Sequence, residues 1–286
     1  MFGRRSGSAF VQVAREYARY RQAFDYFSDR GDAERAARFV AALRDYWWAR
    51  QLFTEGEEWI ARVLKLPDLP SPIHATLQDQ AGALAFAQAD YARARTYFEA
   101  SAQLRRTSGS SYALALALNH LAAAFRWGSA ENVSAAALYE ESLAIARDID
   151  DQLLVAAALM PLGSLAVERG DLEEAERLLQ QGLVIYVDLK LDISYPLALE
   201  QFAALAAALG QPTRALRLAS AGTAWRTRLD TYQTPYAAWI ERHVSRAREA
   251  LSAAAAEHAW VEGHSMTLDQ ALDYAMSQQA DDPSAF

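Results

Sequence analysis

A short motif recurs along this chain at steps of about 40 residues, and this recurrence limits the folds that the chain can adopt. The clearest copy is Gly170-Asp171-Leu172, followed by Ala175 and Leu179. In each copy a small residue is followed directly by a residue that can cap a helix. A second small residue comes five positions after the first, and a bulky residue follows four positions later; some copies match this pattern only loosely. The copies begin at positions 51, 89, 130, 170 and 210. Such spacing indicates a stack of helical hairpins.

The chemistry of the motif explains how it joins two helices. Gly170 can end a helix in the left-handed backbone conformation, and Asp171 can cap the next helix and complement its positive N-terminus. Ala175 lets the two helices approach closely, and Leu179 fills the space one turn further along the same face. Since one hairpin cannot cover its own apolar face, several copies must stack. We therefore expect an all-α fold, a right-handed α-α superhelix of about five hairpins of ~40 residues with flanking helices.

The helix start and stop signals divide the chain into thirteen expected helices with no strand pattern. They are expected at 10–29, 32–49, 53–65, 72–88, 91–107, 111–127, 132–148, 151–169, 172–189, 193–209, 212–228, 235–257 and 267–278. We expect three segments: an N-terminal helix (1–30), the solenoid (31–257) and a closing helix with its tail (258–286). The aromatic residues of the first repeat, including Trp47 and Trp59, are expected to lie in the core rather than at an interface.

The repeat residues resemble those of the tetratricopeptide repeat (TPR) family. Leu162-Gly163 followed by Ala175 and Leu179 is similar to the family pattern L-G, then A-x3-F. The period here is about 40 rather than 34 residues, which makes each helix roughly one turn longer. The resemblance implies a TPR-like solenoid whose function is to bind a partner.

Two further segments narrow the resemblance. The aromatic segment 43–60 and the closing segment 259–272 resemble parts of the long-repeat sensor domains at the C-terminus of LuxR-type and AfsR-type (STAND) bacterial transcriptional regulators. In those regulators the sensor controls an upstream ATPase. Here no P-loop is found, because Lys65 and Lys190 are each followed by leucine. The resemblance therefore implies a cytoplasmic sensor part, with helix 10–29 leading in from a missing domain and exposing an apolar face.

A stack of this kind has one natural binding surface, the concave groove lined by the first helix of each hairpin. When the repeats are aligned on their Leu-Gly positions, the first helix of each of four repeats contributes a pair of candidate residues to the groove. Further candidates lie one or two turns later in the same helices. The candidates are Asp79, Gln80, Phe86, Asn119, His120, Arg126, Trp127, Met160, Glu168, Glu200 and Gln201. The residues at 119, 120, 126 and 127 form the most ligand-like cluster. Alternatively, Trp127 packs between repeats and His120 is only a polar groove residue.

Other classes of function find little support in the residues. The chain has no cysteine, and no two of its histidines have the spacing of a helical zinc pair, so we expect no metal site and no cofactor. No serine elbow is present, and paired acids such as Glu173-Glu174 fall at helix starts or on exposed faces. A net charge of −8 argues against direct nucleic-acid contact. No stretch has the length and apolarity of a membrane span, and 153–167 is predicted to be a buried helix.

These observations favour a non-catalytic interaction or sensor module. Its partner would be a protein, a peptide or a small effector held in the groove. Two alternatives remain open. The first is a free-standing scaffold that joins two proteins without sensing anything. The second is an α-helical solenoid enzyme, which would need an acid–base set in the groove, and the expected groove offers only Glu168, Glu200 and His120 on different repeats.

Overall fold

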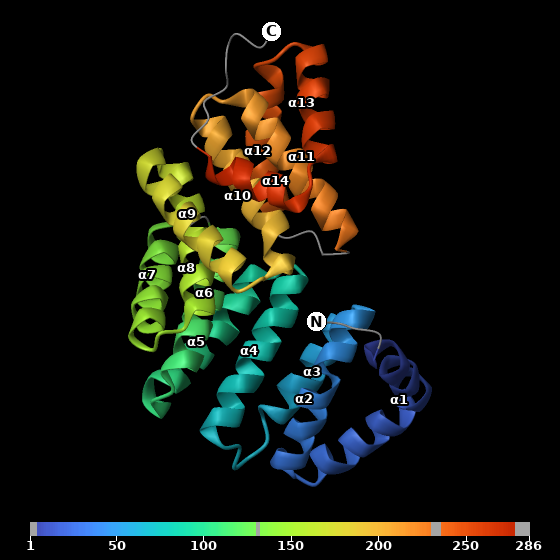
Figure 1. The fold of residues 1–286 in the computed structure, drawn as a ribbon. Coiled ribbons are helices and arrows are strands. Elements are labelled where there is room, and N and C mark those ends of the chain that lie inside the picture. Colours follow the sequence, from blue (N-terminus) through green and yellow to red (C-terminus); the bar gives the residue numbers. More distant parts are fainter. Residues whose placement is uncertain (1–4, 130–131, 230–235, 278–286) are drawn as a thin grey trace. The chain divides into compact units, whose positions relative to one another are not determined.

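The structure is a computed structural model that describes residues 5–129, 132–229 and 236–277 (Figure 1). The chain divides into two compact units, Met1–Leu138 and Tyr139–Phe286. The described residues form helices and turns, with no strand among them.

Unit 1 is built from antiparallel helices joined by short capped turns. Asp32 and Asp90 are the N-caps of their helices, and each accepts a hydrogen bond from the backbone N–H three residues later, at 3.1 and 3.0 Å. The helices are α1 (Arg5–Asp29), α2 (Ala33–Arg50), α3 (Phe53–Val63), α4 (Ser71–Ala87), α5 (Tyr91–Ser108) and α6 (Ser111–Ser129); α7 (Asn132–Asp148) runs from this unit into the next.

Unit 2 continues the same pattern. Gly170 and Gly210 end their helices with φ of 78° and 73°, the left-handed conformation that glycine adopts without strain. Asp171 then caps the following helix, as expected. The helices are α8 (Gln152–Arg169), α9 (Leu172–Asp188), a 3₁₀ turn (Asp192–Ser194), α10 (Tyr195–Ala208), α11 (Pro212–Arg228), α12 (Tyr236–Glu249), α13 (Ala253–Ser265) and α14 (Leu268–Met276).

The small and bulky residues of the repeat pack against each other within a hairpin. A Cβ atom added to Gly163 would lie 2.7 Å from Leu179 Cγ, and one added to Gly82 would lie 2.6 Å from a ring carbon of Phe98. These contacts are closer than any side chain tolerates without movement. The glycines therefore set how closely α8 approaches α9 and how closely α4 approaches α5.

One expected helix is wrong. The sequence predicts a single helix over 235–257, whereas the structure has α12 ending at Glu249 and α13 beginning at Ala253. The Ser252 hydroxyl accepts a hydrogen bond from the backbone N–H of Ala255 at 3.2 Å, so this serine begins a new helix instead of lying inside one. Because α13 runs on to Ser265, the expected boundary between 257 and 258 falls inside it.

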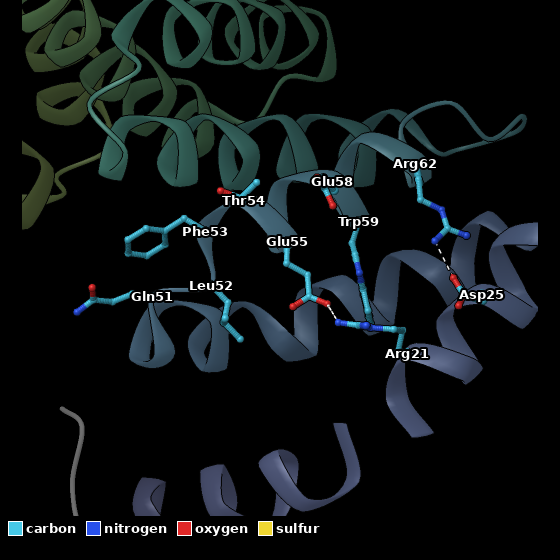
Figure 2. A pocket seen from close by; sticks show the side chains of 10 residues that line it. All are labelled: Arg21, Asp25, Gln51, Leu52, Phe53, Thr54, Glu55, Glu58, Trp59 and Arg62. Atoms are coloured by element: carbon cyan, nitrogen blue, oxygen red, sulfur yellow. Dashed lines mark hydrogen bonds and ion pairs between the residues drawn. The ribbon is translucent and has the colours of Figure 1, made fainter. Parts of the chain in front are cut away.

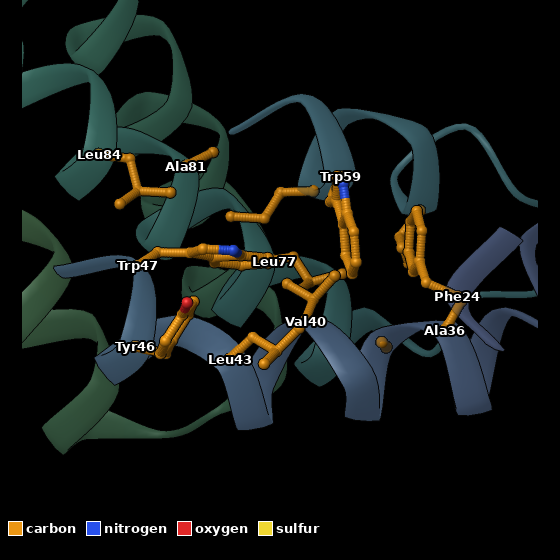
Figure 3. Close-up of a cluster of buried hydrophobic side chains, with 13 residues drawn as sticks. Phe24, Ala36, Val40, Leu43, Tyr46, Trp47, Trp59, Leu77, Ala81 and Leu84 are labelled. Carbon is orange, nitrogen blue, oxygen red and sulfur yellow. The ribbon is translucent and has the colours of Figure 1, made fainter. Parts of the chain in front are cut away.

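The core of unit 1 is aromatic, as expected from its tryptophans (Figure 3). Trp47 is fully buried, and the Phe24 ring stacks on Trp59 with a centroid separation of 4.2 Å. The Trp47 indole N–H donates to the Tyr17 hydroxyl at 2.8 Å. Since Tyr17 and Phe24 belong to α1, this helix packs into the first hairpin. The first hairpin therefore covers part of the apolar face expected on this helix, while Val11 and Tyr26 remain 53% exposed.

Helix α8 is the one described helix that is long and apolar enough to cross a membrane by length and composition. However, 72% of that stretch is buried inside the fold. The burial explains its apolar sequence, because a core helix needs apolar residues on every side.

Candidate functional site

The expected groove residues are divided between the two units, and most of them are buried. Asp79, Gln80, Phe86, Asn119, His120, Arg126 and Trp127 lie in unit 1, whereas Met160, Glu168, Glu200 and Gln201 lie in unit 2. Phe86, His120 and Trp127 are half-buried, Glu168 is exposed, and the remaining seven are buried. The local contacts of each residue therefore determine what it can do.

Two of the candidate acids hold hairpins together. Asp79 on α4 pairs with Arg105 on α5, and in the other unit Glu200 on α10 pairs with an arginine, Arg226, on α11. In both pairs the arginine follows the acid by 26 residues, and all four side chains are at most 15% exposed. Burial raises the pKa of Glu200, and the Arg226 guanidinium opposes this rise. Such acids act as clamps between the two helices of a hairpin.

The cluster that looked most ligand-like is largely internal. Arg126 is only 4% exposed, and its guanidinium lies 4.8 Å from the centroid of the Trp127 ring. The His120 ring lies 5.2 Å from the Phe98 ring, in contact with the packing residue of α5. In the part of the chain that the structure describes, the buried His120 Nδ1 has no hydrogen-bond partner. These residues serve packing more than the capture of an anionic ligand.

The burial of His120 predicts a loss of stability at acidic pH. Desolvation is the main cause that lowers its pKa, and the nearby Arg105 adds to this while Asp79 opposes it. The unfolded chain therefore takes up a proton as the pH falls through about 6.5, while the folded chain resists it. Stability should be complete above this pH and fall by up to about 1.4 kcal/mol per unit below it.

The variant His120→Gln should show a shallower loss of unfolding free energy between pH 7 and pH 5, measured by urea unfolding. The pKa of His243 is also lowered, mainly by desolvation, but it contributes equally to both proteins and cancels from the comparison. Equal pH slopes in the two proteins would contradict this account.

In unit 2, Gln201 joins the first helices of two neighbouring hairpins. Its amide N–H₂ donates to the Ser164 hydroxyl at 2.8 Å and to the Met160 carbonyl at 3.3 Å. These bonds link α10 to α8. Gln201 is 1% exposed, so its role is structural.

Gln80 in unit 1 differs from its repeat counterpart Gln201. It is 9% exposed, and among the described residues its buried Oε1, like that of Gln201, has no hydrogen-bond partner. The difference is that Gln80 lies beside a cavity, whereas the Gln201 amide donates to two groups of α8. It lines a cavity of about 300 Å³ between α2 and α4, which are the first helices of neighbouring hairpins. The cavity is lined by Ala37, Arg38, Ala41, Pro72, Ile73, Thr76, Leu77 and Gln80. We call it the α2–α4 groove. It combines a mainly apolar lining with one buried amide whose oxygen is unsatisfied.

A larger cleft of about 610 Å³ lies between α1, α3 and the turn before α3 (Figure 2). Its arginines are already paired: Arg21 with Glu55, and Arg62 with Asp25 at 2.7 Å. Both pairs tie α1 to α3. This cleft could not be predicted from the sequence, because helix 10–29 was expected to lead in from a missing domain and not to pack on α3.

Comparison with solved structures places this arrangement among known folds. The structure of BtubC (BKLC) from P. vanneervenii is similar, with a TM-score of 0.59 and 17% identity over 79% of this chain and 92% of that chain. A putative kinesin light chain from Podosopora anserina with nearly identical TPR-like repeats has a TM-score of 0.52 and 16% identity over 70% of this chain and 97% of that chain. The chain has a TPR-like solenoid fold.

The apo form of RapI is a further neighbour of this TPR-like solenoid, with a TM-score of 0.58 and 14% identity over 84% of this chain and 95% of that chain. No protein-family model and no curated protein matches the sequence. The expected fold class is therefore confirmed by structural likeness. In the described portion of the solenoid, no group of three or more His, Asp or Glu side chains could hold a metal ion.

Proposed function

We propose that this TPR-like solenoid is a non-catalytic interaction module that holds a segment of a partner protein in the α2–α4 groove. The observation that carries the proposal is the Gln80 amide, buried without a partner for its oxygen beside an apolar cavity. A buried unsatisfied acceptor destabilises a protein by about 1–3 kcal/mol. A backbone N–H of a bound peptide would satisfy it once the Gln80 amide turns toward the cavity.

The lining of the groove defines the class of ligand. Ala37 and Ala41 leave space on α2, while Ile73 and Leu77 provide an aliphatic surface on α4. About 300 Å³ is at the lower limit of small-molecule pockets and suits one or two aliphatic side chains of a peptide. A small apolar effector is the second candidate ligand. Such an effector would displace a bound peptide from the groove in a competition experiment.

We further propose that the module is the regulatory C-terminal part of a LuxR-like or AfsR-like ATPase regulator. The support is the sequence resemblance of segments 43–60 and 259–272 to those sensors. In such a protein the bound segment would control the ATPase and, through it, transcription in the bacterial cytoplasm. A free-standing scaffold would use the same groove without an ATPase. The enzyme alternative loses support because Glu200 is paired with Arg226.

The experiment is a selection of displayed random peptides against the purified chain, followed by site-specific cross-linking. A photo-reactive amino acid replaces either Thr76 in the groove or Thr96 on α5. The two threonines are matched, because both are exposed and each donates to the carbonyl four residues earlier. Peptides with an aliphatic anchor should cross-link at position 76 and not at position 96. No selected peptide, or equal cross-linking at both positions, would contradict the proposal.

A further inference from the structure

Two turns of unit 2 carry related sequences 40 residues apart. In both, an aspartate is followed by an aliphatic residue, then by three other residues and a second aliphatic residue. The first is Asp148-Ile149-Asp150-Asp151-Gln152-Leu153, which runs into the first two residues of α8, and the second is Asp188-Leu189-Lys190-Leu191-Asp192-Ile193, which precedes α10. The backbones also agree, because the third residue of each turn has a left-handed φ, 54° in the first and 53° in the second. The aliphatic side chains therefore occupy equivalent places in the two turns.

All four aliphatic side chains are exposed. Ile149 is 36% exposed, Leu153 45%, Leu189 43% and Ile193 66%. Together they present roughly a few hundred Å² of apolar surface to water, the size of patch that marks interaction sites on soluble proteins. We call these four residues the aliphatic row.

The hydrogen bonds between α8 and α10 bring the two turns together. Gln201 on α10 donates to Met160 and Ser164 on α8, which are 41 and 37 residues earlier in the chain. The same offset relates Leu153 to Ile193, 40 residues apart. The two helices therefore begin at the same end of the unit, which places both pairs of aliphatic side chains at that end.

Acidic residues flank the row. Asp148, Asp150, Asp188 and Asp192 are exposed, against one exposed base in the same stretches, Lys190, and a second, Arg147, just before the first stretch. Asp148 and Asp188 are the last residues of α7 and α9, where the helix dipole disfavours a negative charge. Helix stability therefore does not explain them.

We propose that the aliphatic row and its aspartates form a second docking surface, separate from the α2–α4 groove, for a basic amphipathic protein segment. The leucine or isoleucine side chains of that segment would pack on the row, and its lysines or arginines would pair with the aspartates. Charge complementarity selects this partner, since an anionic membrane surface would be repelled by the same aspartates.

The test uses a fluorescent 18-residue synthetic helix with leucine along one face and lysine along the other, titrated with the full chain. The variant pair Leu153→Gln with Ile193→Gln should weaken its binding at least about tenfold, because two apolar contacts are lost. The matched control is Leu209→Gln with Val261→Gln, which changes two aliphatic residues of unit 2 that are 42% and 56% exposed but lie outside the row. The control should change binding less than about twofold.

The charge arm replaces Asp148 and Asp188 with asparagine. This variant should bind the lysine peptide more weakly and show a smaller dependence of binding on salt, because fewer ion pairs form. A peptide with glutamate in place of lysine should not bind. Equal losses in the row and control variants, binding of the glutamate peptide, or binding of phosphatidylglycerol vesicles instead of the lysine peptide would overturn the proposal.

Discussion

Replacing Arg105 with methionine should lower the unfolding free energy by about 3–5 kcal/mol, because it leaves the Asp79 carboxylate buried without its positive partner. The two side chains are 13% and 12% exposed, so water cannot replace the lost pairing. Asp79 Oδ1 already has no hydrogen-bond partner among the described residues, so the variant leaves both carboxylate oxygens unsatisfied. The measurement is urea unfolding followed by circular dichroism at pH 7.

The double variant Asp79→Met with Arg105→Met should regain most of that stability, because an apolar pair of similar volume replaces the ion pair. Another repeat of this chain already has an uncharged pair at the equivalent spacing, because Met160 and Tyr186 are also 26 residues apart. The surface control is Arg177→Met, which breaks the exposed pair with Glu174 and should cost less than about 1 kcal/mol. If Arg105→Met lowers the unfolding free energy no more than Arg177→Met does, the ion pair of Asp79 and Arg105 does not stabilise the hairpin.

The variant Gly263→Ala should detach the closing helices, because the added methyl group has no space. A Cβ atom at this position would lie 2.1 Å from the Arg217 carbonyl oxygen, 2.7 Å from its Cα and 2.8 Å from its carbonyl carbon. All three are backbone atoms of α11, which cannot move aside as a flexible side chain could. We expect a loss of about 3 kcal/mol, at the upper end of the range for an overpacked core.

Hydrogen exchange is the suitable measurement because the damage should be local. Amides of α13 and α14 should exchange faster, while those of α1–α5 should be unchanged. His264→Ala is the control, since this exposed neighbour in the same helix makes no such contact. Unchanged protection of α13 in Gly263→Ala would show that this helix does not depend on close contact with α11.

Further contacts show what holds the closing helices on α11. Arg214 is buried and donates to the backbone carbonyls of Tyr274, Ala275 and Ser277 at the end of α14. A guanidinium placed there satisfies carbonyls that a helix end leaves unpaired and complements the negative end of the helix. In the segment 259–272, Trp260 and Glu262 also accept hydrogen bonds from Ser220 and Arg217 of α11, so this segment packs on the last repeat of the unit.

The hairpins could be predicted from sequence because their determinants are local. A glycine with positive φ, a capping aspartate and a small–bulky pair lie within about ten residues of each other, as at Gly170, Asp171 and Leu179. The break at Ser252 was missed although its signal is also local, because a serine between alanine-rich stretches is compatible with both a helix interior and a cap.

The candidate site could be predicted only in part, because burial depends on contacts between distant segments. Gln80 and Gln201 occupy equivalent repeat positions and are identical in sequence. Only the structure shows that Gln201 bonds to Ser164, whereas Gln80 lies beside a cavity. Likewise, nothing near Asp79 in sequence identifies Arg105, 26 residues away, as its partner.

The most direct test of the proposed groove is one variant, Gln80→Met, measured for stability and for binding of a peptide selected against the chain. Removing an unsatisfied buried amide should raise the unfolding free energy by about 1 kcal/mol. Peptide binding should weaken about tenfold because the peptide loses its acceptor. The matched variant Gln201→Met should instead lower stability, because its amide donates two hydrogen bonds, and leave peptide binding unchanged. Unchanged peptide binding in Gln80→Met would contradict the account.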